Sequence, residues 1–360
     1  MTHLLATISA HGLGHLGQSA PVLNALRRRV PELQLTVAST LPEVRLRQRI
    51  EGEFRIEARA LDVGFLMQDA FRVDDAASAD AYRALHADWP RRVDQTTAWL
   101  QALQPTLLLC NAAYLPLAAA ARLGLPCFGM SSLNWADLFA HVFEAAAWAP
   151  PIHAQMLDAY RTATLFIKLT PGMAMPALPR SVWAGPVANL GRERRDELRA
   201  RLGAAADERV VLVAFGGIDT RLPLEHWLFP AGLRWLVPQA WGAAHPRVAA
   251  IEALDWHFSD LMASVDAVIG KPGYGTFAEA ACHGTPMLYA PRPGWPEQEP
   301  LVRWLQLHGR ALEVDAATLH SGRLDAALQA LWRLPMPPRV APSGADEVAA
   351  RLAPYCGAGR

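Results

Sequence analysis

Short apolar runs alternate with longer stretches of helical spacing along the chain. In the first half, runs typical of buried parallel strands are Leu4–Ser9, Leu33–Ala38, Phe54–Ala58, Leu107–Cys110, Pro126–Met130, Leu165–Leu169 and Val182–Val187. After the first run, Val22, Leu23, Leu26 and Val30 recur every three or four positions, which is the spacing of an amphipathic helix. This alternation predicts an α/β fold with a parallel sheet.

Longer helices are expected in the middle of this half. A partly polar loop over Leu61–Asp75 is followed by apolar residues of helical spacing, which predict one long helix as far as Leu103. Further helices are predicted at Ala113–Leu123, Trp135–Ala147 and Ile152–Ala163.

A second strand–helix series follows residue 187. Its predicted strands are Arg209–Phe215, Gly232–Val237, Val248–Ile251, Val265–Ile269 and Met287–Ala290. The 360 residues fit two domains. We therefore expect Rossmann-like domains over residues 1–186 and 187–335, joined at Gly185-Pro186 and facing a central cleft. Residues 336–360 are expected to form a tail whose helix, Asp346–Leu352, returns to the first domain.

Composition and charge exclude several classes of protein. Hydrophobic residues make up 52% of the chain and charged residues 19%, which describes a folded domain protein. The 34 basic and 34 acidic residues balance, so net charge predicts no nucleic-acid partner. Four scattered cysteines and no histidines at ligand spacing predict reduced thiols, no metal site and a cytoplasmic location. The longest apolar passage, Thr106–Met130, is broken by polar residues and prolines, so no transmembrane segment is expected.

The glycine-rich turn that follows Val265–Ile269 is the first chemical signal. It places the backbone N–H groups of Gly273, Tyr274, Gly275 and Thr276 at the start of a helix predicted over Thr276–Cys282. A helix N-terminus of this kind holds a phosphate without a metal. Lys271 beside the turn is expected either to contact the phosphate or to be solvated.

Three other features of the second half have alternative interpretations. Thr276 and Glu279 have the spacing of a capping box, so Glu279 either caps the helix or grips the hydroxyls of a ribose. Gly216-Gly217 is either a second phosphate turn or an ordinary tight turn. Glu297-Gln298 either bonds sugar hydroxyls or lies in a surface loop.

The first strand is followed by HGLGHLG, a turn that contains two histidines. Gly12, Gly14 and Gly17 match the dinucleotide fingerprint, but the second strand ends without the acid that would hold a ribose, so a dehydrogenase is disfavoured. His15 is instead expected at the carboxyl end of the first strand, facing the cleft, where a neutral imidazole can remove a proton from a hydroxyl. Otherwise it packs at the turn. His11 is the weaker candidate because it precedes the turn.

The order of these motifs resembles the GT-B glycosyltransferases. The similarity is to the branch of the peptidoglycan N-acetylglucosaminyltransferase, and HGLGHLGQS, SSLNWADLF, KPGYGTFAEA and EQE resemble the glycosyltransferase-like domain of some arabinose kinases. The resemblance implies that the first domain binds the acceptor and that the second binds a nucleoside-diphosphate sugar. A UDP-sugar is the first donor expected. Gly14, Gly216, Gly217, Gly273–Thr276 and Glu279 would then serve the donor, and His15 would be the base.

Asn111 departs from the pattern of these families, whose members often have an Asp there to orient the base. Two rivals to a metal-independent transferase follow: a nucleotide-sugar hydrolase on the same fold, and a non-catalytic nucleotide-sugar sensor. The acceptor would be a small molecule or a lipid-linked one, and the latter requires peripheral membrane contact. No cofactor besides the donor substrate is expected.

Overall fold

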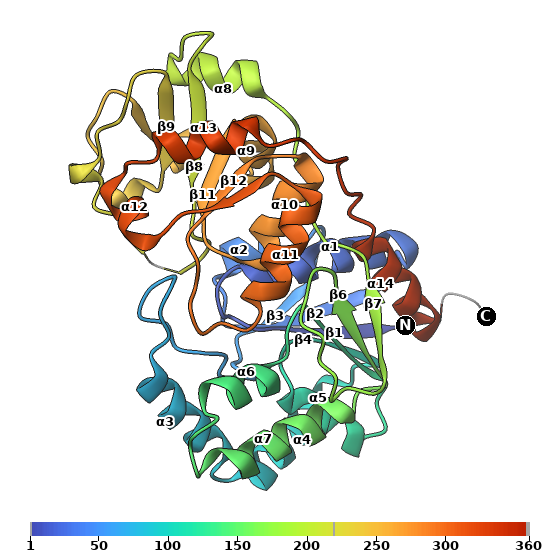
Figure 1. Ribbon diagram of the computed structural model, residues 1–360. Helices are drawn as coiled ribbons and strands as arrows, with labels where there is room; N and C mark the ends of the chain where they lie inside the picture. The colour runs from blue at the N-terminus through green and yellow to red at the C-terminus, as the bar shows by residue number, and fades with distance from the viewer. Residues whose placement is uncertain (1, 219, 358–360) are drawn as a thin grey trace.

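Two parallel sheets organise the part of the chain that the computed structural model describes, residues 2–218 and 220–357 (Figure 1). The first sheet has the order β3-β2-β1-β4-β5-β6-β7 and the second β10-β9-β8-β11-β12-β13. The strands of the first are β1 His3–Ile8, β2 Gln34–Ala38, β3 Arg55–Glu57, β4 Leu107–Asn111, β5 Cys127–Ser131, β6 Leu165–Leu169 and β7 Ser181–Ala184. Those of the second are β8 Arg209–Val213, β9 Leu233–Val237, β10 Val248–Ala250, β11 Ala267–Gly270, β12 Met287–Tyr289 and β13 Ala311–Glu313. The predicted α/β class with two Rossmann-like domains is confirmed.

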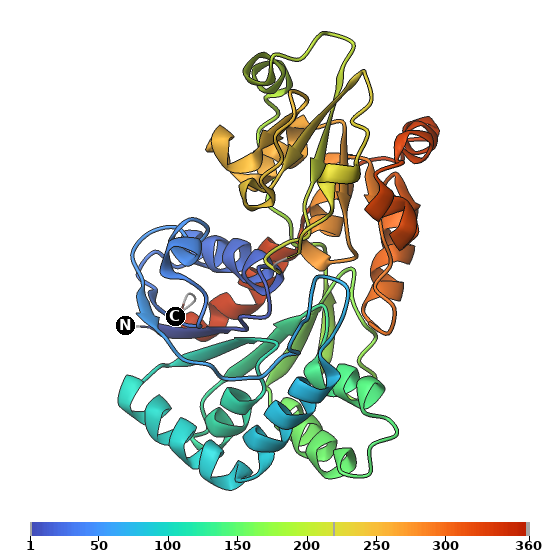
Figure 2. The same ribbon diagram turned by 90° about the vertical axis from the view of Figure 1, so that its left-hand side faces the viewer.

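Helices cover both faces of the first sheet (Figures 1 and 2). The helices of this half are α1 Gly14–Arg29, α2 Glu43–Arg47, α3 Asp75–His86, α4 Trp89–Leu103, α5 Leu115–Arg122, α6 Trp135–Val142 and α7 Ala149–Arg161. Alternate residues of β1 enter different core layers: Leu4 and Ala6 pack in the cluster that contains α1, and Leu5 packs in the one that contains α4 and α5. Burial on both faces explains why these strands read as continuous apolar runs.

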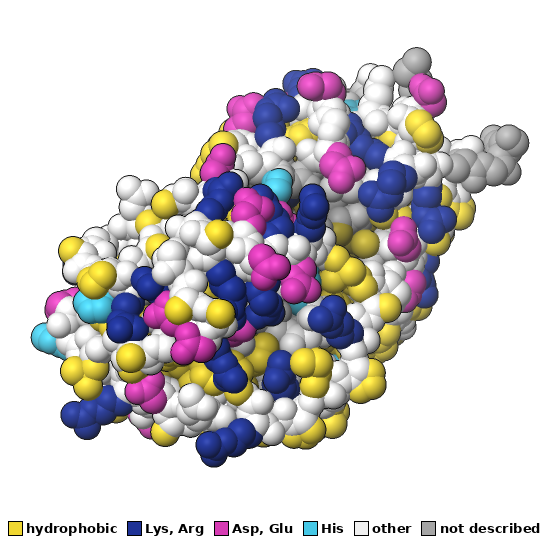
Figure 3. Space-filling view, turned by 90° about the horizontal axis from the view of Figure 1, so that it is seen from above, with side chains coloured by type: hydrophobic (Ala, Val, Ile, Leu, Met, Phe, Trp, Pro, Cys, Tyr) yellow, Lys and Arg dark blue, Asp and Glu magenta, His cyan; other side chains and the backbone are white. Residues whose placement is uncertain are grey.

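The second domain is built in the same way but with shorter elements. Its helices are α8 Arg195–Leu202, α9 Phe258–Ser264, α10 Tyr274–His283, α11 Gln298–His308, α12 Ala316–Ser321 and α13 Asp325–Arg333. On the face shown in Figure 3, lysines and arginines lie interspersed with aspartates and glutamates. No helix of the described residues is long and apolar enough to cross a membrane.

Several predicted helix boundaries are wrong: the helix expected over Trp135–Ala147 already ends at Val142, and the one expected from Ile152 begins at Ala149. The long helix expected before Leu103 is two helices, since α3 ends at His86 and α4 begins at Trp89 with Pro90 in its first turn. Proline lacks the N–H that a continuing helix needs, but it is well suited to a first turn. The helix expected from Thr276 begins two residues earlier, at Tyr274.

The last helix, α14 Gly344–Leu352, returns to the first domain as predicted and packs on α1 (Figure 2). Two chain segments therefore connect the domains, and they lie side by side: Gly344 N–H donates to Pro186 O at 2.9 Å. Glycine is required at Gly344, because a Cβ there would lie 2.0 Å from the backbone oxygen of Gly185. A Cβ on Gly185 would lie 2.1 Å from Ser343 Oγ, which would have to rotate away.

The strand orders fix where a ligand can bind. In the first sheet the chain reverses direction of winding between β1 and β4, and in the second between β8 and β11. Open parallel sheets bind ligands at the carboxyl ends of the strands beside such a reversal.

Candidate functional site

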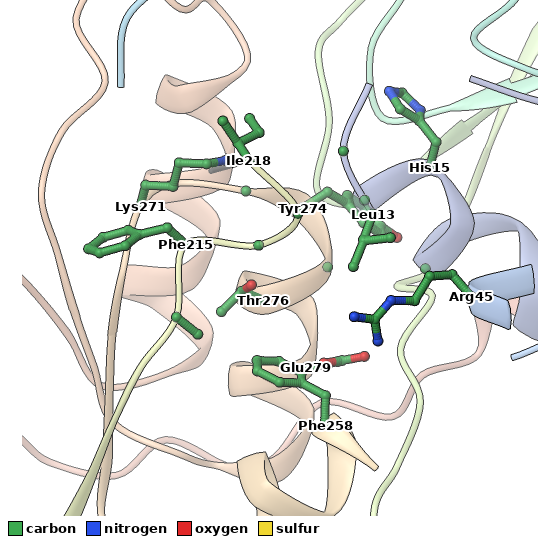
Figure 4. Close-up of a pocket in the computed structure, with 18 of the residues that line it drawn as sticks. Leu13, His15, Arg45, Phe215, Ile218, Phe258, Lys271, Tyr274, Thr276 and Glu279 are labelled. Atoms are coloured by element: carbon green, nitrogen blue, oxygen red, sulfur yellow. The ribbon is translucent and has the colours of Figure 1, made fainter. Parts of the chain in front are cut away.

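A cavity of about 620 Å³ lies between the domains and is lined by both (Figure 4). This volume is in the range of sites for small ligands. Its walls come from the turns that follow β1, β8 and β11 and from the first turn of α10. They include these predicted site residues: His11, Gly14, His15, Gly216, Gly217, Lys271, Gly273, Tyr274, Gly275, Thr276, Glu279 and Glu297. Asn111 and Gln298 are not among the lining residues.

The first turn of α10 presents bare backbone to this cavity. The helix is capped by Gly273, and no side chain of the described residues caps its first N–H groups. The side chain of Tyr274 is turned toward the first domain, where its hydroxyl donates to Thr170 O and accepts from Val187 N. Only the backbone of Tyr274 is therefore available to an anion at the helix N-terminus.

Glu279 does not cap the helix. It lies in the second turn of α10, its side chain lines the cavity, and it accepts a bond from the backbone of Asn189. The capping-box interpretation is therefore wrong. Burial raises the pKa of Glu279 to about 7, while Arg49 and the Asn189 bond act against this shift. In Figure 4 the carboxylate faces the guanidinium of Arg45, which comes from the first domain.

The Gly216-Gly217 turn brings the second domain against the first. Gly216 has a left-handed φ of 76°, and a Cβ on Gly217 would lie 2.7 Å from Leu13 Cγ. Leu13 precedes α1 in the first glycine turn. The two glycine turns therefore meet at the wall of the cavity. They are so close together that a methyl group on Gly217 would not fit.

His15 is held by a hydrogen bond between its Nδ1 and Asn111 Oδ1, 2.6 Å long. His15 lies in the first turn of α1, which follows β1, and Asn111 ends β4. The bond therefore crosses the point between β1 and β4 at which the winding direction of the first sheet reverses. The side chain is only 4% exposed, and burial lowers its pKa, so the imidazole is neutral near pH 7.

The tautomer of His15 follows from a chain of bonds that begins in the second domain. Glu297, as a carboxylate, only accepts, so Ser132 donates its hydroxyl proton to Oε1 at 2.6 Å. Ser132 Oγ then accepts from Gln18 Nε2 at 2.8 Å, and Gln18 Oε1 accepts from Asn111 Nδ2 at 3.1 Å. Asn111 Oδ1 is left to accept from Nδ1–H of His15. The lone pair of His15 is therefore on Nε2, the nitrogen that a base needs.

His11 packs among aromatic rings. Its ring stacks on Trp295 with 5.8 Å between centroids and meets Trp135 edge-on at 5.3 Å. Its Nε2 is buried with no hydrogen-bond partner among the described residues, and burial lowers its pKa well below the usual value.

Several residues of the site were not predicted. Asp62, from the loop after β3, accepts from Trp135 Nε1 at 2.8 Å, and its charge favours the protonated form of His15. Arg292 follows β12 and lines the cavity, although the sequence gives it no motif. Gln18 and Ser132 form the chain to His15. Both residues lie within motifs that carry the family resemblance, HGLGHLGQS and SSLNWADLF, but the sequence analysis assigned neither of them a role.

Gln298 and Glu297 serve as internal partners. Gln298 Oε1 accepts from the backbone N–H of Arg292, and Glu297 accepts from Ser132 and from Trp295 Nε1. Lys271 has no hydrogen bond or ion pair with any described residue. Burial and the charge of Arg292 lower its pKa to about 8. Within residues 2–218 and 220–357, no three His, Cys, Asp or Glu side chains are grouped so as to hold a metal ion.

Comparison with known proteins gives relatives of the same architecture. No family model matches the chain. L-arabinokinase of Arabidopsis thaliana is 25% identical over 321 residues, a match that covers 88% of this chain and 31% of that protein. The chain thus spans about a third of the length of this curated relative.

Two solved glycosyltransferases align over almost the whole chain. The calicheamicin glycosyltransferase CalG4 is 18% identical with a TM-score of 0.62, covering 99% of this chain and 98% of its own. SsfS6 of Streptomyces sp. SF2575, solved with thymidine diphosphate, is 18% identical with a TM-score of 0.58, covering 98% and 99%. The chain therefore has the GT-B fold, with two Rossmann-like domains that face one cleft.

Proposed function

We propose that the protein is a glycosyltransferase that moves a sugar from a nucleoside diphosphate to an acceptor hydroxyl without a metal ion. The observation that carries this proposal is the pairing of groups across one cavity. The second domain offers the bare N–H groups of α10, and the first offers His15 with its lone pair on Nε2. An anion-binding turn opposite a neutral base suits transfer to a hydroxyl.

The donor would lie along the second domain. Glu279 would accept from the two ribose hydroxyls, and the diphosphate would lie on the N–H groups of Gly273–Thr276 and Gly216-Gly217, with Lys271 beside it. A UDP-sugar is the first donor to test, from the family resemblance, and a TDP-sugar the second, because SsfS6 was solved with thymidine diphosphate.

In the reaction, His15 Nε2 removes the proton of the acceptor hydroxyl as its oxygen attacks the anomeric carbon. The bond from that carbon to the diphosphate oxygen breaks, and the electron pair leaves with the diphosphate. The positive end of α10 and Lys271 stabilise this charge. The new imidazolium is stabilised by the negative charge of Asp62.

The test is a two-stage measurement. A thermal-shift screen of UDP, TDP, GDP and ADP and their sugars identifies the donor, since a ligand of the folded state raises the melting temperature. Diphosphate release is then followed with a panel of hydroxylated acceptors, with EDTA present and absent. We expect acceptor-dependent release that EDTA does not abolish and that His15→Ala abolishes.

Other outcomes identify the rivals. Equal release of free sugar without any acceptor would indicate a hydrolase. Tight nucleotide binding with no turnover of any donor would indicate a sensor, and stabilisation by NADH alone would contradict the nucleotide-sugar proposal altogether.

A further inference from the structure

Arg292 is a buried cation without an anionic partner. It is 3% exposed, and its guanidinium lies over the ring of Trp295, 3.5 Å from the centroid. Its one hydrogen bond through the guanidinium goes from Nη2 to the thioether sulfur of Met67, a weak acceptor, at 3.0 Å. Its Nε is buried and has no partner among the described residues, and neither Glu297 nor Asp69, the carboxylates whose charges act on it, forms an ion pair with it. Proteins rarely bury an arginine in this way unless a ligand completes the site.

The surroundings of Arg292 add positive charge. Lys271 lines the same cavity without a hydrogen-bond or ion-pair partner among the described residues, and the charge of Arg292 lowers its pKa. The charges of Glu297 and Asp69 favour the protonated form of Arg292. However, Glu297 accepts from Ser132 and Trp295, and Asp69 pairs with Arg72. The protein therefore leaves this end of the cavity short of negative charge.

The position of Arg292 separates it from the phosphate turn. Arg292 follows β12, one strand outward from β11, whose end carries the turn Gly270–Gly275. Its guanidinium reaches Met67 of the first domain, so it lies where the two domains meet. A donor whose diphosphate lies on the turn must place its sugar between that turn and the first domain, which is the region Arg292 borders.

We propose that Arg292 binds a carboxylate on the transferred sugar, so that the donor is a nucleoside diphosphate uronic acid and not a neutral hexose. Met67 takes one of the two Nη2 protons, and the other lies beside either Nε–H or an Nη1 proton, so the planar guanidinium can still make a two-point bond to a carboxylate. This inference rests on the proposed function, whose donor it specifies. The same anion chemistry is offered by the donor's own phosphate, which the experiment separates from the sugar.

The experiment measures dissociation constants by calorimetry for UDP, UDP-glucose and UDP-glucuronic acid. If TDP binds more tightly than UDP, the same measurement is made with TDP, TDP-glucose and TDP-glucuronic acid. We expect the uronic acid donor to bind at least about tenfold more tightly than the neutral one. Arg292→Met should abolish this preference and change the affinity for the bare diphosphate by less than about threefold. Arg310→Gln is the matched control, since Arg310 also has a buried, unpartnered Nε but lies outside the cavity, and it should keep the preference.

The unliganded variants test whether Arg292 is merely structural. Methionine fits beside Met67 and Trp295 without a charge, so Arg292→Met should keep or raise the melting temperature, because an unpaired buried charge is removed. A melting temperature several degrees lower would overturn the proposal. Equal affinity of the parent for UDP-glucose and UDP-glucuronic acid would also overturn it. So would an Arg292→Met variant that loses as much affinity for UDP as for UDP-glucuronic acid. If no nucleoside diphosphate binds the parent at all, the proposed function itself has failed.

Discussion

Glu279 is the residue at which pH should control donor binding. Its pKa of about 7 reflects burial, and only the carboxylate can accept from the two ribose hydroxyls through both of its oxygens. A raised pKa means that the charged form is present above pH 7 and is lost below it. Nucleotide affinity should therefore fall as the pH is lowered from 8 to 6, as measured by calorimetry.

Substitutions separate this effect from the titration of the nucleotide itself. Glu279→Gln should flatten the pH dependence that the protein contributes, and at pH 8 Glu279→Ala should weaken binding by about 1.5–3 kcal/mol. Unchanged affinity in a well-folded Glu279→Ala protein would show that the carboxylate does not touch the ribose.

His15 and His11 should differ as base and packing residue. Removal of a general base usually costs about 10²–10⁴-fold in rate. His15→Ala should lose at least about a hundredfold in turnover and keep its nucleotide affinity, because the proposed donor site lies on the other domain. His11→Phe preserves the ring that stacks on Trp295, and we expect it to retain turnover within about tenfold of the parent. The reverse order of the two rates would exchange the roles.

Asn111→Asp should impair the protein, although an acid at this position would favour the charged imidazole. An aspartate cannot donate to Gln18 Oε1, so Gln18 must turn its amide. The hydroxyl of Ser132 then lies between two acceptors, Gln18 Oε1 and Glu297 Oε1. It has only one proton, so only one of the two hydrogen bonds can form. An unsatisfied buried acceptor costs about 1–3 kcal/mol. Adding Ser132→Ala should cause little further loss in melting temperature or turnover. Fully additive losses would mean that the bonds are not coupled.

At the scale of elements, the facing glycine turns predict a steric test. Gly217→Ala brings a methyl group against Leu13, and overpacking of this kind costs about 1–3 kcal/mol. The cost falls on the approach of the two turns and not on either domain alone. kcat/KM should fall about 5- to 150-fold while the melting temperature changes little.

Gly14→Ala is the control, because a Cβ there meets nothing within 4 Å and it lies in the facing turn of the same cavity. Because Gly14 is itself a predicted donor-site residue, we expect some loss of kcat/KM, but a smaller one than in Gly217→Ala. If Gly217→Ala is as active as the parent, the turns do not need to meet.

The sequence predicted what depends on neighbours along the chain. The strands, the glycine turn and the turn that contains His15 each depend on a few consecutive residues, so their positions follow from periodicity and turn chemistry. The hydrogen-bond chain joins residues far apart, with 165 positions between Ser132 and Glu297, so no local pattern contains it. Likewise, Glu279 has the spacing of a cap, and only the start of α10 at Tyr274 shows that it lies beyond the first turn.

At the scale of the whole molecule, α14 should stabilise the first domain without touching the donor site. Leu352 is fully buried beside α1, and truncation of such a leucine usually costs about 2–5 kcal/mol. Leu352→Ala should lower the melting temperature of the first domain in calorimetry. Nucleotide affinity, measured well below that temperature, should equal the parent's. Loss of affinity in the folded variant would mean that the helix also supports the second domain.

The paired connections at Gly185-Pro186 and Ser343-Gly344 have a mechanical consequence. One flexible connection would let the domains swing and twist in all directions, whereas two connections bonded side by side leave essentially one axis of rotation. A donor that draws the domains together then has to fix one angle instead of three. The orientational entropy lost on closure is correspondingly small, and every closure returns Leu13 and Gly217 to the same mutual register.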